Sequence, residues 1–172
     1  MKPIDRYALR GHYEGGNVIG LNVERLPAVG ELASRIHNTL VSPEASWNEI
    51  EAFCRKSVEY KFCAVVVQGC RATKVKGLLK GSSTRLSAGV GFPMGGSITK
   101  VKLVEIKEAI IAGADQFDYM ANIGYLKSGM YDEFRQEMTD MVTAAYGRPV
   151  SAMLEFSVLS LSERVEAAVL AE

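Results

Sequence analysis

A carboxylate, Asp118, lies inside the otherwise mostly apolar stretch 116–123. An acidic side chain held away from solvent either accepts hydrogen bonds as a structural group or transfers protons to and from a bound substrate. A second stretch, 150–156, repeats the pattern, with Ser151 and Glu155 among apolar neighbours. Both stretches are therefore candidates for an active or binding site built from polar side chains on mostly apolar strands.

Other residue types that support chemistry have weaker settings. Lys127 is predicted in a loop, where an ammonium stays protonated and is not a nucleophile unless it is buried or lies near another cation. The segment 91–96 is rich in glycine and precedes a helix start at Thr99, so it either cradles a phosphate or shapes a turn. Neither His12 nor His37 has a partner at metal-ligand spacing, and no metal site is predicted. Six lysines are predicted to lie on the exteriors or ends of helices, in contact with solvent: Lys74, Lys76, Lys80, Lys100, Lys102 and Lys107.

Composition excludes several classes of partner and location. The 172 residues carry formal net charge zero, so no positive field attracts nucleic acid or an anionic membrane. No apolar run is long enough for a spanning helix or a secretion signal. The three cysteines, an odd number without zinc-type pairing, indicate a reducing compartment. The sequence therefore predicts a soluble, cytoplasmic protein without nucleic-acid or membrane partners.

The elements that must position these residues alternate along the chain. Residues 1–30 show no steady period and are predicted to form an irregular arm, and 31–172 form one domain. In that domain short β-branched runs alternate with amphipathic segments that begin at cap residues such as Ser46 or end at glycines such as Gly113. The predicted strands are 36–41, 62–67, 86–92, 116–123 and 150–156. Five helices are predicted. The first begins after Ser46, the second ends at Lys80, the third and fourth cover 99–112 and 130–146, and the fifth begins at Ser162.

Strands separated by helices imply parallel pairing through right-handed crossovers, hence an α/β fold. Two architectures fit: a doubly wound open sheet or a (β/α)8 barrel. A central strand of a doubly wound sheet is covered on both faces and is nearly apolar throughout. Alternation puts Gln116, Asp118 and Met120 on one face of the fourth strand, and polar groups there favour a barrel interior that opens into an active site.

Several motifs resemble one known family. Gly113-Ala114-Asp115-Gln116-Phe117-Asp118, Asn122-Ile123-Gly124 and Leu126-Lys127-Ser128-Gly129 are similar to the fourth-strand signature of deoxyribose-phosphate aldolases. Gly91-Phe92-Pro93-Met94-Gly95-Gly96 resembles the exit of that family's third strand, and 36–43 resembles its first strand and turn. The similarity extends from about residue 32 to Glu172.

The resemblance implies a TIM-type (β/α)8 barrel, of which about five βα units are present, and a class I aldolase that needs no metal or other cofactor. Such a lyase cleaves 2-deoxyribose 5-phosphate to glyceraldehyde 3-phosphate and acetaldehyde through a lysine Schiff base. Asp118 matches the carboxylate that assists proton transfer, Thr39 matches the first strand's hydroxyl, and Phe92 is expected to form a pocket wall. The expected partner is a small phosphorylated sugar or aldehyde, and family members often pair as homo-oligomers.

The family's Schiff-base lysine is on a sixth strand, which we expect to lie outside this sequence, so the 172 residues alone are expected to be inactive. Where the family has Asp, Lys and Thr, this chain has His37, Ser151 and Phe156, and Gln68-Gly69 replaces Asn-Pro. Three hypotheses follow: an aldolase of which this is a piece, a degenerate binding or regulatory protein on the same scaffold, and a small open α/β domain with an unknown ligand. Five units of a barrel leave two strand edges unpaired, so we do not expect a stable monomer.

Overall fold

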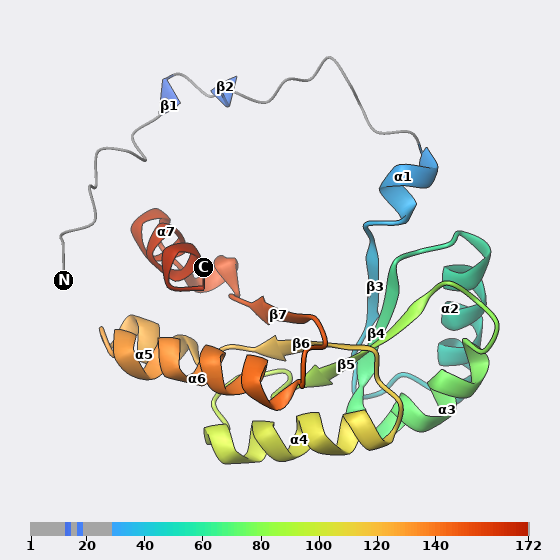
Figure 1. Ribbon diagram of the computed structural model, residues 1–172. Helices are drawn as coiled ribbons and strands as arrows, with labels where there is room; N and C mark the ends of the chain where they lie inside the picture. Colours follow the sequence, from blue (N-terminus) through green and yellow to red (C-terminus); the bar gives the residue numbers. More distant parts are fainter. Residues whose placement is uncertain (1–12, 15–16, 19–28, 172) are drawn as a thin grey trace.

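The computed structural model describes residues 13–14, 17–18 and 29–171 (Figure 1). Two short strands, β1 (Tyr13–Glu14) and β2 (Asn17–Val18), pair antiparallel. The rest of the predicted arm up to residue 28 lies outside the described residues, and its last two residues already belong to helix α1 (Val29–Ala33). The division into an arm and a domain therefore stays a prediction.

The main element is a five-stranded parallel sheet whose strands follow one another in chain order. The strands are β3 (His37–Leu40), β4 (Ala64–Gln68), β5 (Arg85–Val90), β6 (Gln116–Met120) and β7 (Val150–Met153). The segments between and after the strands are α2 (Trp47–Glu59), η1 (Gly69–Arg71), α3 (Ala72–Leu78), α4 (Thr99–Ile111), α5 (Ile123–Lys127), α6 (Tyr131–Ala144), η2 (Phe156–Val158) and α7 (Leu161–Leu170). Figure 1 shows a curved sheet with the helices on its convex side, which is a half-barrel and confirms the predicted architecture. A doubly wound sheet, with helices on both faces, is excluded.

Local signals in the sequence fix several of the helix ends. The predicted capping box is present at α2, where Ser46 N donates to Glu49 Oε2 at 2.7 Å and Ser46 Oγ accepts from Glu49 N. Gly113 and Gly147 follow α4 and α6 with φ of 91° and 78°, a conformation that a side chain disfavours. The chain therefore turns back toward the sheet at the predicted positions.

The hydrophobic core lies between the convex face of the sheet and the helices. It contains the residues that alternate outward along the central strands: Val65 and Val67, Leu86, Ala88 and Val90, and Phe117 and Tyr119. The helices contribute Ile50, Ile106 and Phe134, among others. Complete burial of one such side chain contributes roughly 1.5–3 kcal/mol, so the stability of the fold comes largely from this layer. The concave face is therefore available for polar residues.

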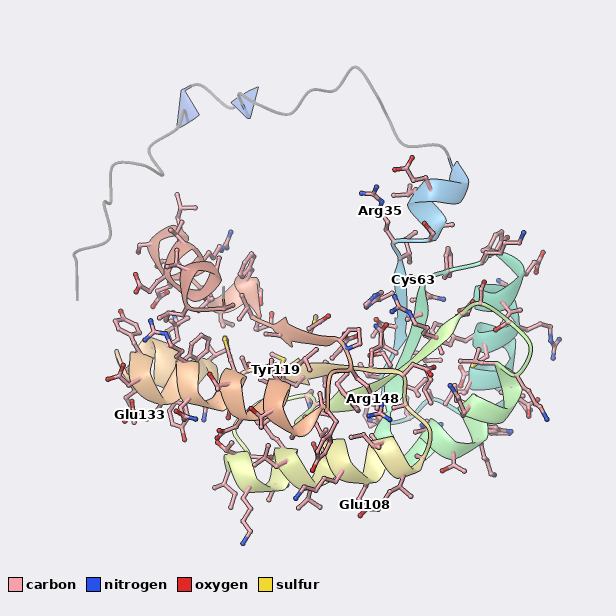
Figure 2. All side chains as sticks on the ribbon, viewed as in Figure 1. Arg35, Cys63, Glu108, Tyr119, Glu133 and Arg148 are labelled. Carbon is pink, nitrogen blue, oxygen red and sulfur yellow. The ribbon has the colours of Figure 1, made fainter. Side chains whose placement is uncertain are left out.

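The predicted position of Lys102 is wrong. Its side chain is fully buried, and Nζ donates to Met120 O and to Glu137 Oε1, each at 2.9 Å. The ammonium also lies 5.9 Å from the centre of the Tyr119 ring. Lys102 faces inward because Glu137, on α6, supplies an opposite charge at the same depth. Glu108, by contrast, is exposed on the side of α4 that points away from the sheet (Figure 2).

The predicted strands are longer than those observed. β6 ends at Met120, and Asn122 Oδ1 then accepts a hydrogen bond from Tyr125 N to begin the short helix α5, which the sequence reasoning missed. β7 ends at Met153, and Glu155 lies in the left-handed region with φ 43°. In both cases polar residues near the carboxyl end of the strand redirect the chain.

Candidate active site

The register of the parallel strands groups the inward side chains into rows. One row runs through Thr39, Val66, Ser87 and Gln116, and the next runs through Gln68, Gly89, Asp118 and Ser151. Alternation puts all of them on the concave face, opposite the hydrophobic core. The polar stretches that the sequence marked on the fourth and fifth strands are thus side by side in the fold.

Asp118 lies near the middle of this face and is only 4% exposed. The sheet curves far enough to bring His37 from β3 across to it, with 3.7 Å between His37 Nδ1 and Asp118 Oδ1. The Gln116 amide nitrogen lies 3.2 Å from His37 Nε2 and 3.3 Å from Nδ1. A carboxylate, an imidazole and an amide therefore meet at one point on the concave face.

The surroundings of Asp118 act on its pKa in opposite directions. Burial raises the pKa, while the charge of His37 and the hydroxyls of Ser151 and Ser87 act to lower it. The net effect is a pKa above the ordinary value for aspartate. Ser87 Oγ and Asp118 Oδ1 have no hydrogen bond to any described residue, so the hydroxyls lower the pKa of Asp118 less than burial raises it.

Three buried polar atoms on the concave face have no hydrogen-bond partner among the described residues. They are Ser87 Oγ, Gln116 Oε1 and Asp118 Oδ1, all from the adjacent strands β5 and β6. An unsatisfied buried polar group costs about 1–3 kcal/mol, so such groups are usually kept for a ligand, water or another chain segment. Their concentration on two adjacent strands makes this face the candidate place for such a partner.

A hollow of about 570 Å³ opens at the carboxyl ends of the strands, where active sites of barrel enzymes are found. Its walls are formed by Val41, Phe92, Pro93, Met120, Ala152, Met153, Leu154, Glu155 and Phe156. Phe92 is one of these wall residues, and its contact with a substrate stays a prediction. Neither Thr39 nor Asp118 lines the hollow: Thr39 is exposed on the concave face, and its hydroxyl donates to His37 O at 3.3 Å.

The glycine-rich segment 91–96 is used by the fold itself. Gly91 N donates to Glu105 Oε2 at 2.6 Å, and Gly95 N donates to Gly91 O at 2.9 Å. Gly95 lies against the chain after β6, where a Cβ would come within 2.3 Å of Ala121 O. Of the two predictions for this segment, the structure therefore favours the turn over the phosphate cradle.

The comparison with known proteins decides the family. A deoxyribose-phosphate aldolase of Mycoplasma mycoides is 37% identical over 141 residues, which is 82% of this chain and 72% of that protein. The chain belongs to the deoxyribose-phosphate aldolase family. The aldolase of Methanothermobacter thermautotrophicus is 37% identical over 90% of this chain, and that of Clostridium kluyveri is 35% identical over 83%. No family model matches the chain.

Solved structures of deoxyribose-phosphate aldolases have the same fold. The tetrameric enzyme of Aeropyrum pernix is 30% identical, with a TM-score of 0.74 over 86% of this chain and 64% of its own. A protein of Coccidioides immitis described as a putative deoxyribose-phosphate aldolase has a TM-score of 0.80 at 28% identity, over 84% of this chain and 57% of its own. The chain spans about two thirds of the length of the curated relatives, for example 66% of the Clostridium kluyveri enzyme.

Lysine is absent from the described part of the concave face. None of the five described strands of the parallel sheet contains a lysine. Lys102 lies on the helix side of the sheet. Lys127 pairs with Glu163 at 2.9 Å near the surface, but it is the last residue of helix α5, so the prediction of a loop position is wrong. Within the described residues, no group of three His, Cys, Asp or Glu side chains is arranged to hold a metal ion. No described helix has the length and apolarity needed to cross a membrane.

Sequence reasoning missed two members of the polar cluster. Ser87 gives no signal by itself, because only the strand register places it beside Gln116. His37 was noted as a departure from the family's aspartate, but two strands, β4 and β5, separate its strand from that of Asp118. The alternation along 116–123 was the one signal available, and it placed Gln116 and Asp118 on a shared face.

Proposed function

We propose that the protein catalyses the retro-aldol cleavage of 2-deoxyribose 5-phosphate to glyceraldehyde 3-phosphate and acetaldehyde, with the amine supplied by a lysine beyond the five strands described. The observation that carries this proposal is Asp118, a buried carboxylate at the centre of the polar concave face in a chain of the aldolase family. The absence of lysine from the described strands supports an amine located elsewhere in the barrel.

The chemistry requires proton transfers that Asp118 is suited to make. A neutral amine attacks the sugar carbonyl and releases water to form an iminium, which accepts the electron pair of the breaking carbon–carbon bond. The hydroxyl on the departing carbon loses its proton as the aldehyde forms, and the resulting enamine gains a proton at carbon before hydrolysis. A carboxyl whose pKa is raised by burial is a stronger base than an ordinary aspartate, and it can both accept and return a proton. We assign Thr39 and Phe92 to the walls of the substrate site.

Borohydride trapping tests the proposal. The protein as it occurs in its source is incubated with 2-deoxyribose 5-phosphate and borohydride, and its intact mass is measured. Reduction of an iminium leaves a stable secondary amine, so a mass increase that requires both reagents is expected. Asp118→Asn should slow cleavage by about 10²- to 10⁴-fold. Asp132→Asn, which alters a side chain that is 98% exposed, serves as the matched control. Absence of an adduct on the protein of natural length would reject the aldolase.

A second function has its own support. His37, Ser151 and Phe156 replace charged or hydroxyl groups that the family's chemistry uses, and such losses are compatible with a catalytically degenerate binding or regulatory protein. This function predicts saturable binding of 2-deoxyribose 5-phosphate by calorimetry without any borohydride-stable adduct. The same two measurements thus separate the two functions.

Assembly and location are also part of the proposal. We assign a small phosphorylated sugar or aldehyde as the partner, a cytoplasmic location and a homo-oligomeric state, with no nucleic-acid or membrane partner. The zero net charge and the tetrameric relative from Aeropyrum pernix support these assignments. Sedimentation equilibrium of the purified protein tests the oligomeric state, since a monomer at all concentrations would contradict it.

A further inference from the structure

We propose that His37 and Asp118 form a proton-exchanging pair, in which the imidazole carries protons between solvent and the buried carboxylate. The inference rests on the proposed function in one respect only: it names the route by which Asp118 regains or loses its proton. The pairing itself follows from the geometry of the concave face.

The two side chains differ in their access to water. Only 6% of the Asp118 side chain is exposed, whereas 32% of the His37 side chain is exposed. Asp118 Oδ1 has no hydrogen bond to a described residue, and His37 Nδ1 is 3.7 Å away from it. A small rotation of the exposed imidazole brings this nitrogen to hydrogen-bond distance, while its outer edge stays in contact with water.

Gln116 can accommodate the imidazole in both protonation states. Once Nδ1 has given up its proton, the neutral ring can accept a hydrogen bond at that nitrogen from the amide nitrogen, which lies 3.3 Å away. An imidazolium has N–H groups on both ring nitrogens and needs an acceptor instead. The amide oxygen of Gln116 is buried and has no partner among the described residues, so a half-turn of the amide presents it to the charged ring. A proton carrier requires this kind of neighbour.

The charges around the pair favour exchange. His37 is the charged group that acts on Asp118, and Ser87 and Ser151 contribute only hydroxyls. A third row of the concave face contains His37, Ala64 and Arg85, and the Arg85 guanidinium donates a hydrogen bond to Cys63 Sγ at 2.8 Å. Transfer of the Nδ1 proton from imidazolium to carboxylate converts an ion pair into a neutral pair. The net charge of the pair is zero before and after the step, which limits its electrostatic cost in a buried site.

Proton NMR of the imidazole tests the pair directly. The sequence has two histidines, so the resonance lost in His37→Asn identifies His37. In Asp118→Asn the imidazole resonances of His37 should move, because a carboxylate 3.7 Å from Nδ1 is replaced by a neutral amide. Asp132→Asn on α6 should leave the His37 resonances unchanged. The same His37 resonances in the native protein and in Asp118→Asn would overturn the pair.

A second measurement keeps the test valid if Asp118→Asn fails to fold. In His37→Asn, the carboxyl carbon-13 resonance of Asp118 should titrate at higher pH than in the native protein, because burial then acts without the imidazolium. An unchanged carboxyl titration would count against the pair. Neither measurement depends on catalysis, so an absent borohydride adduct would reject the aldolase function without affecting this result. In an active protein, His37→Asn should lower kcat more than it changes KM.

Discussion

Replacement of Lys102 by methionine tests whether the buried ion pair with Glu137 holds the carboxyl end of β6 in place. The two side chains are 0% and 1% exposed, and their charged atoms are 2.9 Å apart. Glu137 also accepts hydrogen bonds from Asn122 N at 3.0 Å and from Thr99 Oγ1 at 3.4 Å, so one carboxylate joins α4, α6 and the loop after β6. Methionine retains much of the side-chain volume and leaves this carboxylate without its cation.

Loss of one partner of a buried pair costs about 3–5 kcal/mol, because the remaining charge is not compensated. Domains of this kind are usually stable by only about 5–15 kcal/mol, so the variant should lose a large part of its stability. With a urea m-value of about 2 kcal/mol/M, the unfolding midpoint followed by circular dichroism should fall by roughly 2 M. The double variant Lys102→Met, Glu137→Gln should recover part of the loss, since an amide oxygen still accepts from Asn122 N.

The matched control is Lys127→Met. Lys127 pairs with Glu163 over the same 2.9 Å, but the two side chains are 43% and 29% exposed, and solvent screens their attraction. The midpoint of this variant should stay close to that of the native chain. Equal midpoint shifts for Lys102→Met and Lys127→Met would refute the argument that burial, rather than the ionic contact itself, gives the inner pair its importance.

Two further predictions concern the loop after β5 and the acid limit of stability. Gly95→Ala should destabilise the chain by at least about 1–3 kcal/mol in urea unfolding, because φ is 67° and the new Cβ would meet Ala121 O. Gly96→Ala is the control: no atom lies near its Cβ, so its stability should be nearly unchanged. Lys127 and Ser160 lower the pKa of Glu163 from 4.5 to about 2, so the stability contributed by its charge is complete above 4.5 and is lost as the pH falls toward 2. Unfolding midpoints measured down this range should therefore decline less steeply in Glu163→Gln, and parallel declines in the two proteins would contradict the assignment.

The sequence predicted those features that depend on local pattern. Alternation along 116–123 placed Asp118 on a polar face, and the structure puts it on the concave side of a half-barrel. Helix α2 begins after the capping residue Ser46, and helix α4 ends before Gly113, as their residue types predict. These predictions succeed because the relevant interactions lie within a few residues of one another.

The features that could not be predicted depend on distant partners. Lys102 has the sequence setting of a surface lysine, and only Glu137, 35 residues later, makes its burial possible. The approach of His37 to Asp118 depends on the curvature accumulated over β4 and β5. Phe92 lines the hollow, and the roles of Asp118, Thr39 and Phe92 in substrate binding and proton transfer stay predictions.

The sequential strand order has a consequence for how the chain acquires its structure. Each strand of the parallel sheet pairs with the one made just before it, from β3 through β7, so no strand has to wait for a partner synthesised much later. Each pairing therefore closes only the loop of one strand–helix–strand crossover, so the entropic cost of each closure stays moderate. The structure can then grow on the ribosome one strand and one helix at a time, and each added helix shields the newest strand as it emerges.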